Sequence, residues 1–305
     1  MLCNRVRKNR RHLRKWAKRE HVTCYRLYDK DIPEIPIVID WYDGRLHIAE
    51  YVRRDETAGD DWLDAMASAV AAALDIASEQ VFVKRRARQR GAEQYRQFAA
   101  SGERDVIHEG GHKFYINLSD YIDTGIFLDH RPLRARVQAE SSGARVLNLF
   151  CYTAAFSVYA AAGGASSSLS IDLSNTYLSW AGDNFNLNEL GDEHKLLRAD
   201  VMEFLSRKHH GDPFDLAVVD PPTFSNSKKM AEELDTQRDQ ALLINGTLRL
   251  LRPGGCLYFS TNNRRFKLEP DNIEATSIED ISASTIPPDF RNAKIHRCWR
   301  IVKPS

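Results

Sequence analysis

The 305-residue chain has no long apolar run, few cysteines and no sign of a cleaved leader. Its apolar runs all fall short of the roughly 18 residues that a membrane span requires, and its N-terminus lacks the apolar core of a signal peptide. The five cysteines are scattered, odd in number and without a CxxC pair, so they support neither a disulfide framework nor a zinc cluster. We therefore expect a cytoplasmic protein with no membrane contact and no bound metal.

Acidic residues are nearly absent from the first twenty positions, although the formal net charge of the whole chain is only +1. Glu20 is the one acid there. The cations are Arg5, Arg7, Lys8, Arg10, Arg11, Arg14, Lys15, Lys18 and Arg19. We expect residues 4–20 to form a basic helix within a linker that covers residues 1–22. Such a helix can be a solvated connection or can bind a polyanion, and both possibilities stay open.

Two domains are expected after this linker. Residues 23–108 carry short β-type runs around Asp43-Gly44, a strong hairpin signal, and an alanine-rich helix over 61–74. This stretch predicts a small α+β domain. From residue 109 to residue 305, β-type and helical stretches alternate, which predicts an α/β, Rossmann-like domain with a mostly parallel sheet.

A strand, a tight loop and a helix within residues 145–172 form the centre of the second domain. The strand at 145–150 is apolar on both faces, as a central parallel strand must be. Asp172 ends the next strand, and ligands of such folds bind outside the carboxyl ends of the strands. Its carboxylate could hold a ribose diol through charge-assisted hydrogen bonds. The alternative is an ordinary βαβ unit in which Asp172 caps a helix at Ser174.

Acidic residues recur at the ends of three successive strands, at Asp172, Asp200 and Asp220. Asp200 could contact the exocyclic amine of an adenine, or it could only cap the helix that follows it. A bound nucleoside would explain the whole set. Because the chain has neither a P-loop nor a GxGxxG loop after the first core strand, a nucleoside cofactor without phosphates fits better. S-adenosylmethionine is the obvious candidate.

The sharpest local signal is Asp220-Pro221-Pro222. Two prolines restrict their own φ angles and the residues before them, which predicts a rigid turn with exposed carbonyls at the sheet edge. The Asp220 side chain and a proline carbonyl could then hold the hydrogen-bonding edge of a base, while Phe224 stacks on its ring.

Residues 123–131 precede the first core strand. Phe127 offers a stacking face, and Asp129 opens a helix. We expect this segment to cover a nucleotide pocket, although an N-cap with no ligand is the alternative.

A second basic stretch follows the last predicted strand of the small domain. Cations alternate there with an amide, a glycine and an aromatic ring, a composition that suits a loop tracking a nucleic-acid backbone. The alternative is a solvated flexible loop. The RNA-binding candidates are Arg85, Arg86, Arg88 and Arg90, together with Lys228 beyond the Asp-Pro-Pro turn.

Four segments together resemble class I methyltransferases of large-subunit ribosomal RNA. They are Asn148-Leu-Phe-Cys-Tyr-Thr153, Asp172, Asp220-Pro-Pro-Thr-Phe-Ser-Asn-Ser-Lys228 and Thr124-Gly-Ile-Phe-Leu-Asp-His-Arg131. The resemblance is greatest to the guanine-N7 half, the C-terminal one, of the bifunctional RlmK/L family. It implies a seven-stranded, mostly parallel sheet, S-adenosylmethionine as cofactor, and 23S ribosomal RNA or its precursor as substrate. It also implies a partner half, with an RNA-binding module and an N2-guanine methyltransferase, that this sequence does not contain.

By this resemblance, Asp172 binds the ribose and Asp200 the adenine. The methionine portion is held by Asn148, Phe150, Tyr152 and Thr153, with Phe127 and Asp129 nearby. Asp220 also contacts the cofactor, and the base is held by Asp220, Pro221, Pro222 and Phe224. One departure is Ala154, where loops of this kind usually carry glycine; alanine is tolerable there if its φ angle stays negative.

Three other functions stay open. Methylation of cytosine C5 usually needs a cysteine nucleophile, and residues 220–228 contain none, although Cys151 and Cys256 could lie near. Methylation of guanine N2 normally places an aromatic residue directly after the prolines, where this chain has Thr223. A noncatalytic RNA-binding assembly factor with a vestigial cofactor pocket is the alternative from another class.

Overall fold

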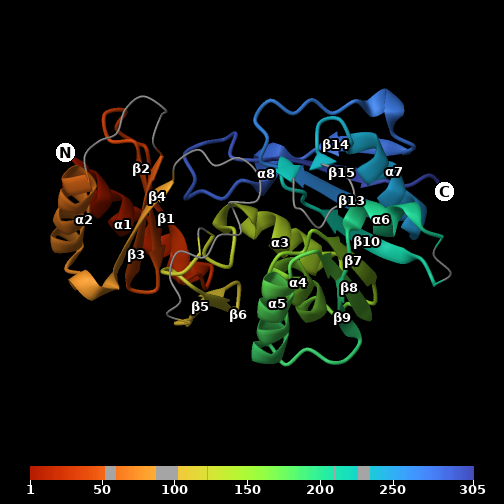
Figure 1. Ribbon diagram of the computed structural model, residues 1–305, viewed down its shortest axis with the longest axis horizontal. Coiled ribbons are helices and arrows are strands. Elements are labelled where there is room, and N and C mark those ends of the chain that lie inside the picture. Colours follow the sequence, from red (N-terminus) through yellow and green to blue (C-terminus); the bar gives the residue numbers. More distant parts are fainter. Residues whose placement is uncertain (52–59, 87–101, 122, 209–210, 226–233) are drawn as a thin grey trace. The chain divides into compact units, whose positions relative to one another are not determined.

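A computed structural model of the protein describes residues 1–51, 60–86, 102–121, 123–208, 211–225 and 234–305 (Figure 1). These residues form two compact units. Unit 1 consists of Met1–Leu128 with Pro288–Asn292, and unit 2 consists of Asp129–Pro287 with Ala293–Ser305. The domain boundaries expected after residues 22 and 108 stay predictions. Among the described residues, no helix combines the length and the apolarity that crossing a membrane requires.

Unit 2 is built on a seven-stranded sheet in the order β14-β15-β13-β10-β7-β8-β9. The strand β15 runs antiparallel to both of its neighbours, and the other pairs are parallel. This confirms the expected α/β fold with a mostly parallel sheet. The strands are β7 (Arg145–Leu149), β8 (Ser167–Asp172), β9 (His194–Arg198), β10 (Phe214–Val219), β13 (Leu251–Thr261), β14 (Ser277–Asp280) and β15 (Arg297–Val302).

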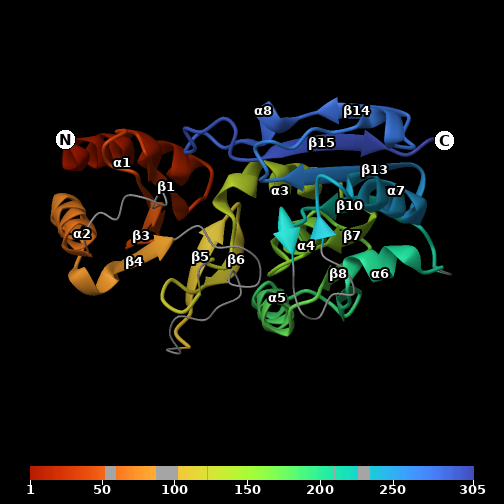
Figure 2. The same cartoon turned by 45° about the horizontal axis from the view of Figure 1, so that its top comes forward.

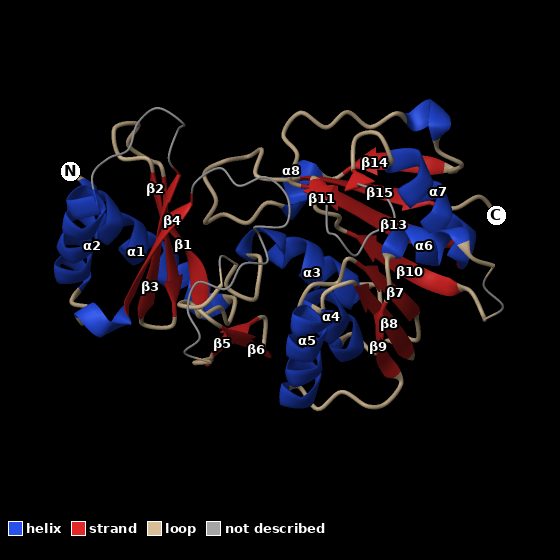
Figure 3. Cartoon of the chain, viewed as in Figure 1, coloured by secondary structure: helices blue, strands red, loops and turns tan. Residues whose placement is uncertain are grey.

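Helices cover both faces of this sheet, as Figure 3 shows in blue and red. The alternation of side chains along β7 explains the two layers: Leu147 and Leu149 join the core under α6 and α7, whereas Val146 joins the core under α3 and α4. The helices are α3 (Arg131–Ala139), α4 (Ala155–Ala162), α5 (Asn175–Leu187), α6 (Val201–Ser206), α7 (Gln240–Leu250) and α8 (Ser282–Thr285). Short pieces complete the unit: β11 (Phe224–Ser225), β12 (Leu234–Asp235) and the 3-10 helix η4 (Pro270–Asn272). The 3-10 helix η3 (Leu128–His130) begins at Leu128, the last residue of the first segment of unit 1.

Unit 1 holds a four-stranded sheet in the order β1-β2-β3-β4. Its strands are β1 (Cys24–Asp29), β2 (Ile37–Tyr42), β3 (Arg45–Tyr51) and β4 (Val81–Arg86). Asp43 and Gly44 both have positive φ angles, 44° and 93°, and form the expected two-residue turn between β2 and β3. A second hairpin joins β5 (Asp105–Glu109) to β6 (His112–Ile116) through Gly110 and Gly111.

Two helices pack on the first sheet, α1 (Leu2–Arg19) and α2 (Asp60–Leu74), and η1 (Ser78–Gln80) leads into β4 (Figure 2). The sparse apolar stripe of α1 is buried. Leu2, Val6 and Leu13 belong to the same hydrophobic core as β1, β2 and β3. The basic N-terminal helix is therefore a structural part of unit 1.

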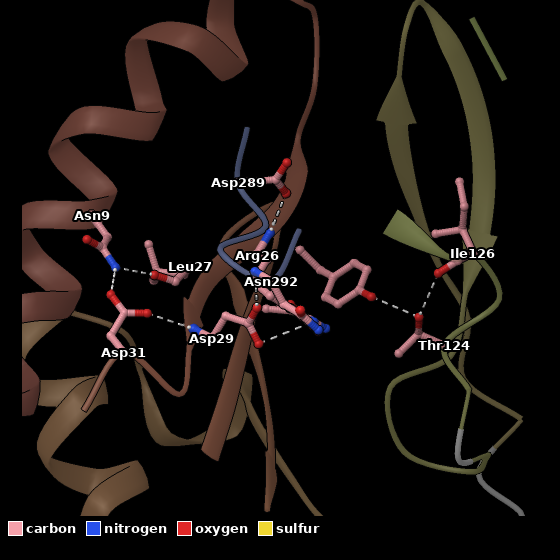
Figure 4. Close-up of polar contacts among 11 residues, drawn as sticks. Asn9, Arg26, Leu27, Asp29, Asp31, Thr124, Ile126, Asp289 and Asn292 are labelled. Atoms are coloured by element: carbon pink, nitrogen blue, oxygen red, sulfur yellow. Dashed lines mark hydrogen bonds and ion pairs between the residues drawn. The ribbon is translucent and has the colours of Figure 1, made fainter. Parts of the chain in front are cut away.

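A segment from late in the chain, Pro288–Asn292, belongs to unit 1 and lies against β1 (Figure 4). The backbone N–H of Arg26 donates to Asp289 Oδ2 at 2.8 Å, and the N–H of Asn292 donates to Asp29 Oδ2 at 3.3 Å. The Arg26 guanidinium makes two hydrogen bonds to Asp40, at 2.9 and 3.1 Å, and lies 4.3 Å from the centre of the Phe290 ring. This largely buried ion pair links β1 to β2.

Candidate active site

The loop after β7 turns sharply through three residues in the left-handed region. Phe150, Tyr152 and Ala154 have φ angles of 56°, 53° and 58°. The N–H of Cys151 donates to the carbonyl of Ile171 at 3.0 Å, and the N–H of Ala154 donates to the carbonyl of Cys151 at 2.8 Å. The loop is therefore tied to the end of β8 and held in a strained shape, as functional loops often are.

The condition stated for Ala154, a negative φ, is not met in the structure. Ala154 is the left-handed residue directly before α4, and its side chain is completely buried. A left-handed alanine costs about 1–2 kcal/mol relative to the right-handed form. Burial of its methyl group offsets about 0.8 kcal/mol of that cost. Packing thus offsets part of the cost, and the backbone at Ala154 remains strained.

Asp172 stands at the carboxyl end of β8, as expected, and closes the loop of β7. Its Oδ2 accepts the N–H of Tyr152 at 3.0 Å, and its Oδ1 accepts the N–H of Ser174 at 2.9 Å. Burial raises the pKa of Asp172, while these backbone hydrogen bonds oppose the shift. The N-cap of α5 is Ser174, whose own hydroxyl accepts the N–H of Tyr177. A raised pKa means that the buried carboxylate still lacks some of the solvation it had in water, which hydroxyl donors of a ligand would supply.

Asp200 is the N-cap of α6, so the simpler reading of this residue holds in the structure. Its Oδ1 accepts the N–H groups of Met202 and Glu203 at 2.8 and 3.2 Å. Within the described part of the chain, Oδ2 accepts no hydrogen bond. Capping and contact with an adenine amine are therefore compatible, because they use different oxygens.

Asp220 follows β10 and is joined to the segment that opens α3. His130 Nε2 lies 3.3 Å from Asp220 Oδ2, and the side chain of Asp220 is 22% exposed. The His130 ring stacks on His296, with centres 4.6 Å apart and planes 10° apart. His296 Nδ1 lies 2.9 Å from Asp129 Oδ2, and its Nε2 lies 2.9 Å from Thr285 Oγ1. Two expected site residues, Asp129 and Asp220, are thus connected through a pair of histidines.

The electrostatics of this cluster favour a neutral His130. Burial lowers its pKa, against the opposing effect of the Asp220 and Asp129 charges. A neutral imidazole can donate from Nε2 to Asp220. Its Nδ1 is buried and has no hydrogen-bond partner within the described residues.

Ligand atoms of Asp129, His130 and His296 lie within 4.8 Å of one another, which raises the question of a metal. The ring geometry argues against a shared ion. The nitrogen lone pair of an imidazole lies in the plane of its ring. Because the two rings stack with planes 10° apart, their lone pairs lie in nearly parallel planes and do not converge on one ion. Both nitrogens of His296 also have partners already.

The Asp-Pro-Pro turn is fixed by neighbouring hydroxyls. Thr236 Oγ1 donates to the carbonyl of Pro222 at 2.7 Å, so that carbonyl is not the exposed acceptor expected from the sequence. Thr223 Oγ1 donates to Asn262 Oδ1 at 2.6 Å. Phe224 begins β11, which pairs with β12, and the structure describes its backbone alone.

Two other expected cofactor residues, Asn148 and Thr153, are buried and make hydrogen bonds that stabilise the loop after β7. Asn148 is only 1% exposed, and its amide donates to Ser157 Oγ at 2.9 Å under α4. Thr153 is fully buried, and its carbonyl accepts the Asn184 amide at 3.0 Å.

Three aromatic residues complete the expected set. Phe150 is half-buried. Tyr152 meets the edge of Tyr177, with ring centres 4.5 Å apart. Phe127 lies in unit 1, with 41% of its surface exposed.

The expected RNA-binding residues are only partly described. Arg85 and Arg86 are the last residues of β4 and not part of a loop. Lys84 Nζ donates to the carbonyl of Ser119. Arg88, Arg90 and Lys228 lie outside the described residues.

The thiols of unit 2 are poor nucleophiles. Burial raises the pKa of Cys151 and of Cys298 well above the usual value, and it raises the pKa of Cys256 to about 12. Since the thiolate is the reactive form, these cysteines are buried structural residues.

His130 and His296 were not singled out as site residues from the sequence. His296 directly precedes β15, and no motif around it indicates a site. A signal for His130 was present, because it stands between Asp129 and Arg131 in a segment expected to cover the pocket. Nothing in the sequence links it to a histidine near the other end of the chain.

The comparisons agree with this architecture. The sequence pattern of a family described as S-adenosylmethionine-dependent methyltransferase matches residues 30–298. The chain is 50% identical over 306 residues to the ribosomal RNA large subunit methyltransferase K of Neisseria meningitidis, covering 98% of this chain and 86% of that protein. It is 49% identical over 307 residues to the ribosomal RNA large subunit methyltransferase K/L of Pseudomonas fluorescens, of which it spans only 40%.

A solved structure has a similar fold. It is a putative methyltransferase complexed with SAH, with a TM-score of 0.77 and 24% sequence identity, and the match covers 99% of this chain and 80% of that one.

Proposed function

The chain belongs to the S-adenosylmethionine-dependent methyltransferases, and we propose that it methylates the N7 atom of a guanine in 23S ribosomal RNA. The names of its relatives support the ribosomal RNA substrate. The choice of N7 rests on the resemblance and on the chemistry around Asp220. Because the chain spans 40% of the K/L relative, we propose for it the activity of one half of such a protein.

The observation that carries the proposal is the contact of His130 with Asp220 at the carboxyl end of β10. A carboxylate only accepts hydrogen bonds, and it must therefore meet the donor side of a base. Guanine has its N2 amine on one side, and its N7 and O6 acceptors on the other. If Asp220 receives the donor side, N7 stays free of the carboxylate, and in the proposed reaction it faces the methyl group.

The described residues fit the cofactor. Asp172 has a carboxylate whose pKa burial raises, at the strand end where ribose hydroxyls would donate to it. Asp200 Oδ2 could accept an adenine amine, and the strained loop from Phe150 to Ala154 would hold the methionine portion. When bound, the cofactor supplies an electrophilic methyl group.

The remaining work of the protein is alignment. Guanine N7 has a lone pair and no proton to lose, so the reaction requires no general base. A neutral His130 with Nε2 3.3 Å from Asp220 suits this chemistry, because it can orient an acceptor and removes no proton from the substrate. Holding the base in line with the methyl group and excluding water supply the rate acceleration. A guanine within a duplex must first be extruded, which costs a few kcal/mol.

Cytosine C5 methylation is the weaker candidate. Burial raises the pKa of Cys151, Cys256 and Cys298, and a thiolate nucleophile is what that chemistry needs. A noncatalytic assembly factor would not need the acceptor set at Asp172, Asp200 and Asp220.

The test is product identification. Unmodified 23S ribosomal RNA, transcribed in vitro, is incubated with the protein and isotopically labelled S-adenosylmethionine, digested, and analysed by mass spectrometry. We expect labelled 7-methylguanosine with the wild-type protein and with Asp192→Ala, an exposed control, but not with Asp220→Ala. Labelled 5-methylcytidine or N2-methylguanosine would keep the cofactor and overturn the target.

A further inference from the structure

The helix α1 presents a row of cations that fold stability does not explain. Lys8, Arg11, Lys15 and Lys18 recur at spacings of three, four and three residues, which places them on one side of a helix. We call them the outer face of α1. All four are exposed, and none of their side chains makes a hydrogen bond or ion pair with another described residue.

Other cations of the same helix have structural roles. Arg7 Nε donates to the carbonyl of Ala73 at 2.9 Å, and Arg10 donates to the carbonyl of Leu74 at 3.0 Å. These carbonyls end α2, whose last turn contains no basic residue, so the two arginines neutralise the negative end of its dipole. Arg10 also lies 4.2 Å from the centre of the Trp41 ring. The outer face of α1 makes no comparable contact within the described residues.

Electrostatic repulsion among the cations of the outer face destabilises α1 when no anion is bound. Like charges three and four residues apart on a helix repel one another, and Glu20 is the single acid among the first twenty residues. The helix is held in place from the opposite side, where Leu2, Val6 and Leu13 enter the core. Removing the outer cations should therefore not unfold α1. A polyanion that neutralises them would turn a repulsive row into a binding surface.

We propose that the outer face of α1 binds backbone phosphates of the RNA substrate, an inference that rests on the proposed function. From Lys8 to Lys18 the row extends over about 15 Å. At the roughly 3.4 Å spacing of phosphates along one strand of B-form DNA, that length faces about four phosphates, and the shorter rise of an A-form RNA duplex brings slightly more of them within it. Lysine and arginine on a rigid helix meet such a series without base recognition, so this surface positions the RNA and does not select its sequence.

RNA suits this surface better than a membrane does. A helix that lies in a lipid interface presents an apolar face to it, whereas the apolar residues of α1 are turned into the core. RNA also suits it better than a protein partner, because protein interfaces concentrate aromatic and apolar anchors, and the outer face of α1 consists of cations.

The test compares two variants of the full chain with the same loss of charge. Lys8→Gln, Arg11→Gln and Lys15→Gln are combined in the first variant. Lys195→Gln, Lys208→Gln and Arg249→Gln are combined in the control, because these exposed cations lie in unit 2 and their side chains make no hydrogen bond or ion pair with the described residues. Binding to the 23S transcript is measured as a function of salt by filter binding, and cofactor affinity is measured by calorimetry.

We expect the first variant to bind RNA at least about tenfold more weakly at low salt. Its logarithmic salt slope should be smaller by about 2 to 3, since each lost phosphate contact removes roughly 0.7–0.9. The control variant should keep the wild-type slope, and both variants should keep the wild-type cofactor affinity. An unchanged slope in the first variant, or an equal decrease in both, would overturn the proposal. Lost binding to anionic vesicles with unchanged RNA binding would overturn it in favour of a lipid surface.

Failure here and failure of the proposed function can be distinguished. If the wild-type protein methylates an atom other than guanine N7 while the first variant loses RNA affinity, the target is wrong and the RNA surface stands. If 7-methylguanosine forms and RNA affinity is the same in both variants, the surface is wrong and the activity stands.

Discussion

His130 Nε2 lies 3.3 Å from Asp220 Oδ2 and joins the start of α3 to the end of β10. The histidine is buried and stacked on His296, which is itself held by Asp129 and Thr285. Asp220 is therefore oriented by residues that come from opposite ends of unit 2. In the proposed reaction, His130 is a positioning residue that acts through Asp220.

Removing the His130 donor should impair turnover more than cofactor binding. We expect His130→Ala to lower kcat at least about tenfold, which corresponds to roughly 1.4 kcal/mol of transition-state stabilisation. His130→Asn keeps an N–H donor and should recover part of this loss. The measurement is methyl incorporation into RNA, with cofactor affinity determined separately by calorimetry. Wild-type kcat in His130→Ala would contradict a positioning role.

The low pKa of His130 predicts a pH-dependent stability. Burial holds its pKa below the ordinary value, despite Asp220 and Asp129 and with support from His296 and Arg134. As the pH falls below about 6.5, the unfolded chain takes up a proton at this histidine before the folded chain does. The free energy of unfolding should therefore be unaffected by this histidine above that pH. It should decrease as the pH falls toward the lowered pKa of His130. The melting temperature should decrease more between pH 7 and pH 5 in the wild type than in His130→Asn, and equal decreases would refute this.

Asp172→Asn should weaken cofactor binding and have little effect on the melting temperature. Loss of a charged hydrogen-bond acceptor costs about 1.5–3 kcal/mol, so cofactor affinity should fall roughly 10- to 150-fold in calorimetry. Burial raises the pKa of Asp172, which means that its charge is unfavourable in the folded protein at neutral pH. Removing the charge should offset the lost acceptor for the Tyr152 N–H, and the melting temperature should change by only a few degrees.

Asp192→Asn, at an exposed position, is the control for Asp172→Asn. Its cofactor affinity should equal that of the wild type. Unchanged affinity in Asp172→Asn as well would place the ribose elsewhere.

Much of this fold follows from local patterns, whereas the connections within the site do not. The apolar run of β7, the Asp43-Gly44 turn and the acidic strand ends are local signals, and each stands where the sequence predicts it. The left-handed φ of Ala154 depends on how α4 must leave β7, which composition does not reveal. The Thr236 hydroxyl that donates to the Pro222 carbonyl comes from a neighbouring loop, so this hydrogen bond has no local signal either.

The histidine pair is the clearest case of a long-range relationship. His130 and His296 are brought together because α3 packs against the same core cluster as Cys298, which lies two residues after His296. A single sequence contains no signal for that contact. The segment Pro288–Asn292, which joins unit 1 from late in the chain, is equally invisible to local periodicity.

The stability of unit 1 should depend on the ion pair between Arg26 and Asp40. Asp40 is 7% exposed, so Arg26→Met would leave a buried carboxylate without its partner. We expect a loss of roughly 3–5 kcal/mol. Adding Asp40→Leu to Arg26→Met should restore most of the stability, because an apolar pair removes the uncompensated charge. Thermal unfolding of the single and double variants checks this, and a double variant no more stable than the single one would contradict it.

The central claim is transfer of a methyl group to N7, and strand cleavage measures it most directly. Methylation at N7 puts a positive charge on the imidazole ring of guanine, after which borohydride reduces the base and aniline cleaves the strand at that nucleotide. The 23S transcript, treated with protein and S-adenosylmethionine, should be cut at one guanine by the wild-type protein and by Asp192→Ala, and remain uncut with Asp220→Ala. Labelled methyl groups in an RNA that stays uncut would contradict the account.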